Sequence, residues 1–256
     1  MGKLIRMDLY RMLKSKPFLV CLILSFVLAL AGEPLGKLLF DLGRTLSPDF
    51  AEIYPAEASL SGIITNPFPM MGMMLAMISL CYFFYADVEN GYIKNIAGQV
   101  PTKGLTILSK YAASGVHNLI FAAVGIIGNL IGTLLVRRIV ADGSVLEMIR
   151  VLVLKLLLMQ SLCAILLLVV STFRSKPLGM ILAVLFGLGM TSLIYMGINE
   201  GLRRIFGPET DISKFMADSV MNENPLDTVK ALLVSVVTGC VFLIPAIRIF
   251  DRKDVK

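Results

Sequence analysis

Charged side chains are scarce in this chain: Asp, Glu, Lys and Arg make up 16% of its 256 residues, whereas hydrophobic residues make up 57%. Soluble domains carry roughly 25% charged and about 45–50% apolar residues. A soluble fold of this length could not hide so much apolar surface from water. The composition, with a mean hydropathy of +0.82, excludes a soluble enzyme, a secreted disulfide scaffold and a disordered tail. It predicts a membrane protein.

The residues that form metal and redox sites are also few. There is one His, and the four cysteines lie inside apolar stretches without C-x-x-C spacing: Cys21, Cys81, Cys163 and Cys240. This pattern supports neither a zinc site nor a disulfide framework, and it suits small buried thiols. A methionine cluster could bind Cu(I) through soft sulfur, but no Cys or His lies beside it, so we predict no metal site.

Nucleotide-binding and catalytic motifs are absent as well. A chain that hydrolyses ATP needs Gly-x-x-x-x-Gly-Lys-Ser/Thr, and the two Gly-Lys pairs, Gly2-Lys3 and Gly36-Lys37, lack the rest of it. An intramembrane enzyme would need paired catalytic residues at membrane depth, and the apolar stretches contain none. They also contain no Asp or Glu, which argues against an ion-coupled antiporter. We therefore expect no enzymatic activity in this chain.

What the sequence does contain is a series of six apolar stretches, each suited to a membrane-crossing helix of about 20 residues. They predict an all-α polytopic membrane protein with a single membrane domain over residues 1–256 and spans at 17–32, 68–86, 107–136, 151–173, 177–197 and 228–250. The first span is short and ends at Glu33-Pro34. Its basic start resembles a signal peptide, but that start is itself patterned as a helix, so we expect it to be retained.

The basic residues predict the orientation. The net charge of +6 could indicate nucleic-acid binding, but Lys and Arg gather at the ends of the apolar stretches, as orientation charges do. With both termini in the cytoplasm, cytoplasmic segments hold 14 of the 24 basic residues, and the outer segments hold 13 of the 18 acids. We therefore predict cytoplasmic termini and no nucleic-acid partner.

The segment 3–16 is patterned as an amphipathic helix lying along the cytoplasmic leaflet. Apolar residues share one side of it and basic residues take the other; the residues that define it are Ile5, Arg6, Leu9, Arg11, Met12 and Leu13. The alternative is an orientation signal with no further role.

The cytoplasmic connection 87–104 is longer than a hairpin between membrane helices requires. It contains an apolar pair, Ile93 and Ile96, at helical spacing, which could dock into a groove on a partner. Asp87, Glu89 and Lys94 would then form a polar rim. The residues we assign to this contact are Asp87, Glu89, Gly91, Tyr92, Ile93, Lys94, Asn95 and Ile96. A solvated loop is the alternative.

These features together resemble the permease subunit of ABC-2-type transporters. The matching elements are the basic amphipathic start that runs into the first span, the acid–Asn-Gly-Tyr-Ile-Lys-Asn stretch after the second, the Pro-Thr-Lys turn and the Lys-Tyr start of the third. The resemblance implies six membrane helices, a coupling segment at 87–98, and a separate ABC ATPase that carries ATP and Mg²⁺. It further implies assemblies of two ATPases with two permeases, either copies of this chain or this chain with a related one, in the bacterial cytoplasmic membrane.

Small systems of this kind resemble exporters and immunity transporters for antimicrobial or amphipathic peptides, including toxins. Polarizable Met side chains suit promiscuous apolar surfaces, so we take Met70, Met71, Met73 and Met74 as candidates for such a pathway. Asn118 and Asn129 share one face of the third span and are further candidates. Hydrogen bonding between packed helices is the alternative for both asparagines. An ATP-independent carrier and a non-transporting scaffold or sensor subunit also remain open.

Overall fold

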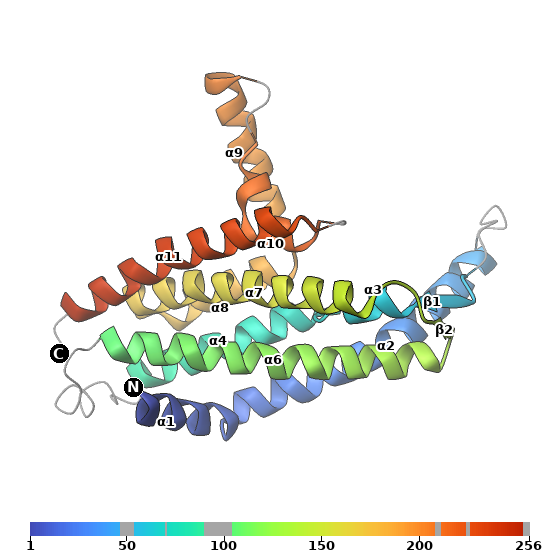
Figure 1. Cartoon of the computed structure of the whole chain (residues 1–256), viewed down its shortest axis with the longest axis horizontal. Coiled ribbons are helices and arrows are strands. Elements are labelled where there is room, and N and C mark those ends of the chain that lie inside the picture. Colours follow the sequence, from blue (N-terminus) through green and yellow to red (C-terminus); the bar gives the residue numbers. More distant parts are fainter. Residues whose placement is uncertain (47–53, 70, 90–103, 208–210, 224–225, 253–256) are drawn as a thin grey trace.

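The computed structural model describes residues 1–46, 54–69, 71–89, 104–207, 211–223 and 226–252, and its elements form an elongated helical bundle (Figure 1). The helices are α1 (Gly2–Leu13), α2 (Lys16–Leu46), α3 (Leu60–Ile64), α4 (Gly72–Glu89), α6 (Gly104–Leu134), α7 (Val145–Phe173), α8 (Lys176–Gly187), α9 (Thr191–Phe206), the 3-10 turn η1 (Ser213–Phe215), α10 (Ala217–Met221) and α11 (Thr228–Arg252). Two short strands, β1 (Glu57–Ser59) and β2 (Arg138–Val140), pair in parallel.

The bundle is built from three close helix pairs: α7 with α11, α2 with α6, and α4 with α8. The core lies where α4 and α7 meet these partners, and its fully buried members include Met77, Leu80, Leu158, Leu162 and Leu166. Leu, Ile, Val and Ala make up more than half of α6 and of α7, which continue for 31 and 29 residues.

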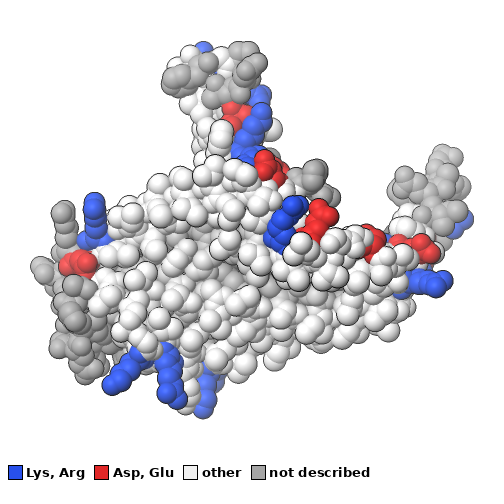
Figure 2. All heavy atoms as spheres, in the orientation of Figure 1, with Lys and Arg blue, Asp and Glu red and all other residues white. Residues whose placement is uncertain are grey.

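The all-helical membrane class predicted from composition is confirmed by four helices that are long and apolar enough to cross a bilayer: Lys16–Thr45, Gly104–Leu134, Val145–Phe173 and Thr228–Asp251. The bent pair α8–α9 raises the number to five if it forms one span, and Gly72–Asp87 is a shorter apolar helix. On the face shown in Figure 2, charged side chains gather at the bundle ends and near α9, and a surface of uncharged residues separates them.

The first long helix, α2, continues past the predicted end of the first span at residue 32 and includes Pro34. Pro34 has no N–H, so the carbonyl of Leu30 lacks its helical hydrogen bond. That carbonyl oxygen instead faces Gly132 of α6, where an added Cβ would collide with it. Beyond this point Glu33 accepts a hydrogen bond of 2.8 Å from the hydroxyl of Tyr54. Contacts with distant residues therefore hold the helix together where the sequence pattern indicated its end.

The fifth predicted span, 177–197, is not one straight helix. Helix α8 ends at Gly187, α9 begins at Thr191, and the two axes differ by 85°. Gly189 in the connecting turn has φ +66°, a conformation that favours glycine. Helix α9 then projects away from the bundle (Figure 1), and it continues past residue 197, the predicted end of the span, to Phe206.

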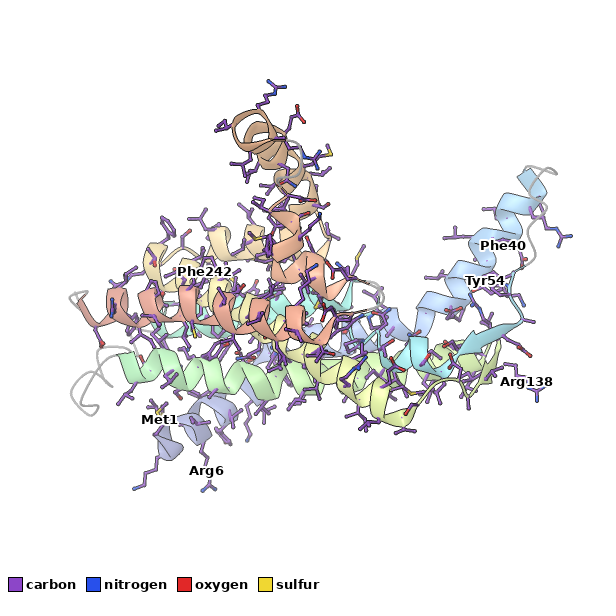
Figure 3. The ribbon with its side chains drawn as sticks, turned by 45° about the horizontal axis from the view of Figure 1, so that its top comes forward. Met1, Arg6, Phe40, Tyr54, Arg138 and Phe242 are labelled. Carbon is purple, nitrogen blue, oxygen red and sulfur yellow. The ribbon has the colours of Figure 1, made fainter. Side chains whose placement is uncertain are left out.

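Different elements lie at the two ends of the bundle. The start of α1, the end of α4, the start of α6 and the end of α11 lie at one end, here named the terminal end (Figure 1). The two strands, α3 and the end of α2 lie at the other, here named the strand end. Figure 3 shows Met1 and Arg6 at the terminal end and Phe40, Tyr54 and Arg138 at the strand end.

Candidate functional site

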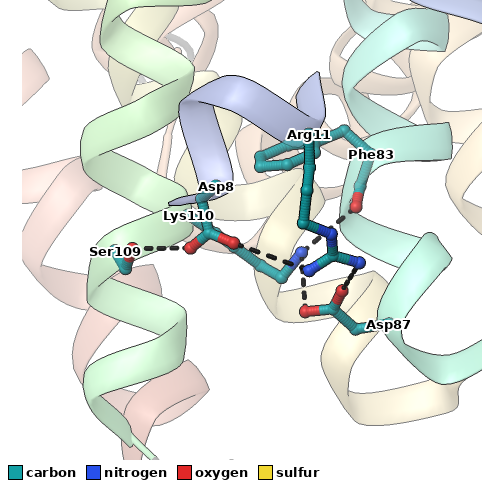
Figure 4. Close-up of polar contacts among 6 residues, drawn as sticks. All are labelled: Asp8, Arg11, Phe83, Asp87, Ser109 and Lys110. Atoms are coloured by element: carbon teal, nitrogen blue, oxygen red, sulfur yellow. Dashed lines mark hydrogen bonds and ion pairs between the residues drawn. The ribbon is translucent and has the colours of Figure 1, made fainter. Parts of the chain in front are cut away.

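A cluster of four charged side chains is packed between α1, α4 and α6 at the terminal end (Figure 4). Asp8, Asp87 and Lys110 are buried, with exposed fractions of 2%, 4% and 4%, and the side chain of Arg11 is 27% exposed. Two carboxylates and two cations make the cluster neutral overall. Burial of charge at this density requires such pairing, because an isolated ion in an apolar environment is very unfavourable.

Asp87 lies at the centre of the cluster. Its Oδ1 accepts a 2.7 Å hydrogen bond from Nη2 of Arg11, and its Oδ2 lies 3.0 Å from Nζ of Lys110. The same ammonium donates to the backbone carbonyl of Phe83, at 3.1 Å, and lies 4.3 Å from the centre of the Phe83 ring. Asp87 thus joins the last turn of α4 to both α1 and α6.

Asp8 occupies the second anionic position. It accepts a 2.5 Å hydrogen bond from the hydroxyl of Ser109, and its Oδ1 lies 3.8 Å from Nη1 of Arg11. Burial raises the pKa of the Asp8 carboxyl above its ordinary value of 3.8, although Lys110 and the Ser109 hydrogen bond oppose this. The charged form of Asp8 is therefore less favourable here than it would be in water.

Local sequence spacing accounts for how the cluster assembles. Asp8, Arg11 and Met12 are three and four positions apart on α1, so they lie on one side of the helix, and Met12 is fully buried there. Ser109 and Lys110 are adjacent in the second turn of α6, so they reach two different partners, Asp8 and Asp87.

A second polar contact lies at the same end of the bundle. The backbone N–H of Gly104, the first residue of α6, donates to Oδ1 of Asp251 near the end of α11, at 2.5 Å. Asp87 and Gly104 lie on either side of residues 90–103, which fall outside the described part of the chain. Both ends of that stretch are therefore joined by polar contacts to other helices.

Most of the residues predicted to dock a partner fall within that stretch. Gly91, Tyr92, Ile93, Lys94, Asn95 and Ile96 lie outside the described residues. Asp87 is described, and it is buried among cations, whereas the sequence pattern placed it on a polar rim. The ion pairs explain this difference, because Arg11 and Lys110 draw the carboxylate inward. Glu89 is exposed and lies 3.9 Å from Lys176.

The amphipathic segment predicted at 3–16 is helical over Gly2–Leu13, as α1, and it packs more closely on the bundle than expected. Met12 is buried and Ile5 and Leu9 are half-buried, against α6 and α2, while Arg6 and Leu13 are exposed. Arg11 does not lie with the outward basic residues, because it turns toward Asp87.

The candidate pathway residues are dispersed. Met71 is exposed and Met73 is buried, Met74 packs against Gly187 of α8, and Met70 lies outside the described residues. Asn118 is buried between α6 and α7, where it donates to Gln160 at 3.1 Å and to Cys163 at 3.3 Å. Half-buried Asn129 lies three turns away on α6. The contacts of Asn118 fit the interpretation as hydrogen bonding between helices.

Sequence reasoning missed four members of this site: Asp8, Ser109, Lys110 and Asp251. One signal was available, because Asp8 shares the apolar side of α1 with Ile5 and Met12. An acid at that spacing indicates a buried charge with a partner on another helix. No local pattern identifies which cation that partner is.

Within the described ranges, no group of three or more His, Cys, Asp or Glu side chains is arranged to hold a metal ion. Comparison with known proteins adds no assignment: no protein-family model matches the chain, and neither a curated protein nor a solved structure matches it significantly.

Proposed function

We propose that this chain is the membrane-spanning permease subunit of an ABC-2-type exporter, with ATP hydrolysed by a separate subunit that binds ATP and Mg²⁺. The observation that carries the proposal is that Asp87 and Gly104, which flank residues 90–103, are both bound to other helices at the terminal end. Asp87 precedes this stretch and is bound to Arg11 and Lys110, and Gly104 follows it and is bound to Asp251.

Such anchoring suits a segment that passes motion from a partner to the bundle. A displacement of residues 90–103 would act on α4 through Asp87, on α6 through Gly104, and on α1 and α11 through their ion-pair and hydrogen-bond partners. Breaking a buried ion pair is strongly unfavourable, so these helices would move together rather than separately. Coordinated helix motion of this kind is what alternation between inward- and outward-open states requires.

The remaining assignments follow from the resemblance to ABC-2 permeases. Two permeases, identical or related, would form the pathway beside two ATPases in the bacterial cytoplasmic membrane, with both termini of the chain in the cytoplasm. Amphipathic or antimicrobial peptides are the proposed cargo, exported from the cell or the membrane. The exposed apolar side chains of the bundle supply a surface that such peptides can contact.

The test is co-expression with the ATPase encoded beside this chain, followed by affinity pull-down in mild detergent and an ATPase assay of the eluate. The test variant is Ile93→Asp, which places a charge in the proposed docking pair. Phe215→Asp is the matched control, because Phe215 lies in η1, away from the terminal end, and is 67% exposed.

We expect wild type and Phe215→Asp to retain the ATPase and Ile93→Asp to lose it. Equal retention by all three would overturn the docking assignment. Failure to capture an ATPase under any condition would instead support an ATP-independent carrier or a scaffold subunit.

A further inference from the structure

Helix α9 leaves the bundle at a steep angle and carries an apolar side that the rest of the described chain leaves exposed. Its axis lies 85° from that of α8, and α8 packs on α4 and α7 inside the bundle. Ile194, Ile198 and Ile205 are spaced by four and seven positions, so they share one side of α9. Their exposed fractions are 47%, 45% and 74%. Three large apolar side chains therefore face outward from the protein.

The charged residues of α9 lie on its other side. Glu200, Arg203 and Arg204 are three and four positions apart and are all exposed, and Arg204 pairs with Glu200 at 3.2 Å. In Figure 2 the charged side chains along α9 lie on the side nearer the strand end, and the side nearer the terminal end is uncharged over most of its length. Leu193 and Met196, also exposed, extend the apolar surface around the start of α9. The helix is therefore amphipathic in its second half and mainly apolar in its first.

Hydrogen bonds hold α9 to the segment that follows it. The hydroxyls of Thr191 and Tyr195 both donate to the carboxylate of Asp218, the second at 2.9 Å. Asn199 donates to Asp211 at 2.6 Å. Asp218 is buried, and its helix α10 packs on α7 and α11. These contacts fix the direction and the rotation of α9 relative to the bundle, so its isoleucine side faces away from the protein by construction.

Helix α9 lies at the level where one of the candidate spans begins. The turn η1 packs on α9, and α10 packs on both η1 and α11, whose apolar stretch starts at Thr228. The ion pair of Glu223 with Lys230 lies beside that start, and charged groups are rare deeper in a bilayer. If the long helices cross the bilayer along the bundle, a helix at 85° to α8 runs along the membrane surface. The exposed charges of Glu200 and Arg204 exclude the hydrocarbon core as its location.

The exposed side of α9 is too small to hold two copies of the chain together by itself. A helix of 16 residues is about 24 Å long, and one side of it is about 10 Å wide. Two such sides would bury about 480 Å², well below the roughly 1,200 Å² that a stable protein interface buries in total. Phospholipid requires no such minimum area, because it already surrounds a bundle that crosses the membrane.

We propose that α9 binds the phospholipid surface of the membrane and lies in its headgroup region. Ile194, Ile198 and Ile205 contact the acyl chains, and Glu200 and Arg204 contact headgroups and water. Amphipathic helices with this division of apolar and charged residues lie in the plane of the interface. Because α9 is bound to α10, its position fixes the depth of the bundle in the membrane. The proposal requires only that the long helices cross a bilayer, and it is independent of ATP-driven export.

The experiment measures the surroundings of single positions on α9 in the full chain, reconstituted into phosphatidylcholine vesicles. Ile198→Cys and its matched control Glu200→Cys are labelled separately with an environment-sensitive fluorophore. Both variants also carry Cys240→Ser, because Cys240 is exposed and the other three cysteines are buried. Iodide on both sides of the membrane quenches labels in water. Phosphatidylcholine with a nitroxide near the head or near the end of its acyl chain quenches labels at those two depths.

We expect the label at Ile198 to emit at shorter wavelength than the label at Glu200. It should lose more fluorescence to the nitroxide near the head of the chain than to iodide, and the label at Glu200 should show the reverse. Stronger quenching of the Ile198 label by the nitroxide at the chain end would place α9 across the hydrocarbon core and overturn the proposal. Resistance of this label to every quencher would show that a second copy covers it, and iodide quenching equal to that of Glu200 would place it in water; either result would also overturn the proposal.

A second pair of positions keeps the proposal testable if Ile198→Cys fails to fold. Ile205 is the most exposed of the three isoleucines, so Ile205→Cys removes few contacts. Arg204→Cys is its matched control, because Arg204 is the adjacent residue and lies on the charged side. The same contrast between lipid and iodide quenching is expected. Identical quenching of these two labels would contradict the assignment of the two sides.

Discussion

Oδ1 of Asp87 lies 2.7 Å from Nη2 of Arg11, a residue 76 positions earlier in the chain. This ion pair joins the end of α4 to the amphipathic helix α1, and Lys110 binds the other carboxylate oxygen. Helix α1 is therefore held on the bundle by charge as well as by the apolar contact of Met12. Because of this ion pair, a displacement of the end of α4 would also displace α1.

We predict that Asp87→Asn lowers the free energy of unfolding by about 3–5 kcal/mol, since removing one partner leaves buried cations without compensation. The partial exposure of Arg11 favours the lower part of this range. The chain has no Trp, so unfolding is followed with a thiol-reactive dye that reports exposure of the buried Cys21, Cys81 and Cys163.

The control for Asp87→Asn is Glu147→Gln, which breaks an exposed ion pair with Arg150. Exposed pairs contribute about 0–1 kcal/mol, so this variant should unfold close to wild type. Equal destabilisation by both substitutions would show that burial of the Asp87 cluster contributes nothing to stability.

The raised pKa of Asp8 predicts a dependence of stability on pH. The unfolded carboxyl titrates near 3.8 and the folded one at higher pH. Between the two values the folded state binds more protons, so the free energy of unfolding falls as pH rises through this window. Asp8→Asn does not titrate. Its melting temperature relative to wild type should therefore increase as pH rises above 3.8, and a constant difference would contradict the burial effect.

Close packing of α6 on α2 predicts a large effect at Gly132. A Cβ at this position collides with the carbonyl oxygen of Leu30, and one at Gly128 would lie 2.9 Å from the Cβ of Ala29. Gly132→Leu should lower the free energy of unfolding by about 1–3 kcal/mol or more, because a backbone atom cannot move aside as a side chain can.

Gly197→Ala in α9 is the control for this packing effect. Apart from its own helix, no atom lies within 4 Å of the added Cβ. The substitution should therefore be neutral, or raise the free energy of unfolding by about 0.4–1 kcal/mol, because alanine lowers the conformational entropy of the unfolded chain. The dye assay used for Asp87→Asn compares the two variants. A tolerated Gly132→Leu would show that α2 and α6 do not pack as closely as described.

The proposed orientation predicts opposite labelling at the two ends of the bundle. Arg138→Cys at the strand end should react with a membrane-impermeant maleimide on intact cells. Arg6→Cys at the terminal end should react only after permeabilisation. Both positions are exposed (Figure 3), and the wild-type chain, with Cys240 on the apolar face of α11, supplies the background. The reverse pattern would place both termini outside.

The bounds of several helices could be predicted because they depend on the local sequence, namely on where an apolar stretch begins and ends. The helices at 104–134, 145–173 and 228–252 begin and end within a few residues of the apolar stretches, except that α7 begins six residues before the predicted span. Long apolar runs leave no other way to satisfy backbone hydrogen bonds in lipid. The break at 188–190 was not predictable in the same way, since α8 and α9 are apolar on both sides of it.

The sequence alone determined that this is an all-helical membrane protein. Long apolar runs favour lipid over water, and in lipid the backbone must satisfy its hydrogen bonds within each helix, so neither effect depends on which helices pack together. It also indicated that residues 3–16 form an amphipathic helix and that residues 87–104 are an unusual connection. Tertiary structure decided the rest. Which cation meets Asp87 and how α2 passes Pro34 depend on contacts between residues 76 and 102 positions apart, Arg11 with Asp87 and Leu30 with Gly132. Pairing at such distances arises only when the helices pack, since no local periodicity encodes a partner on another helix.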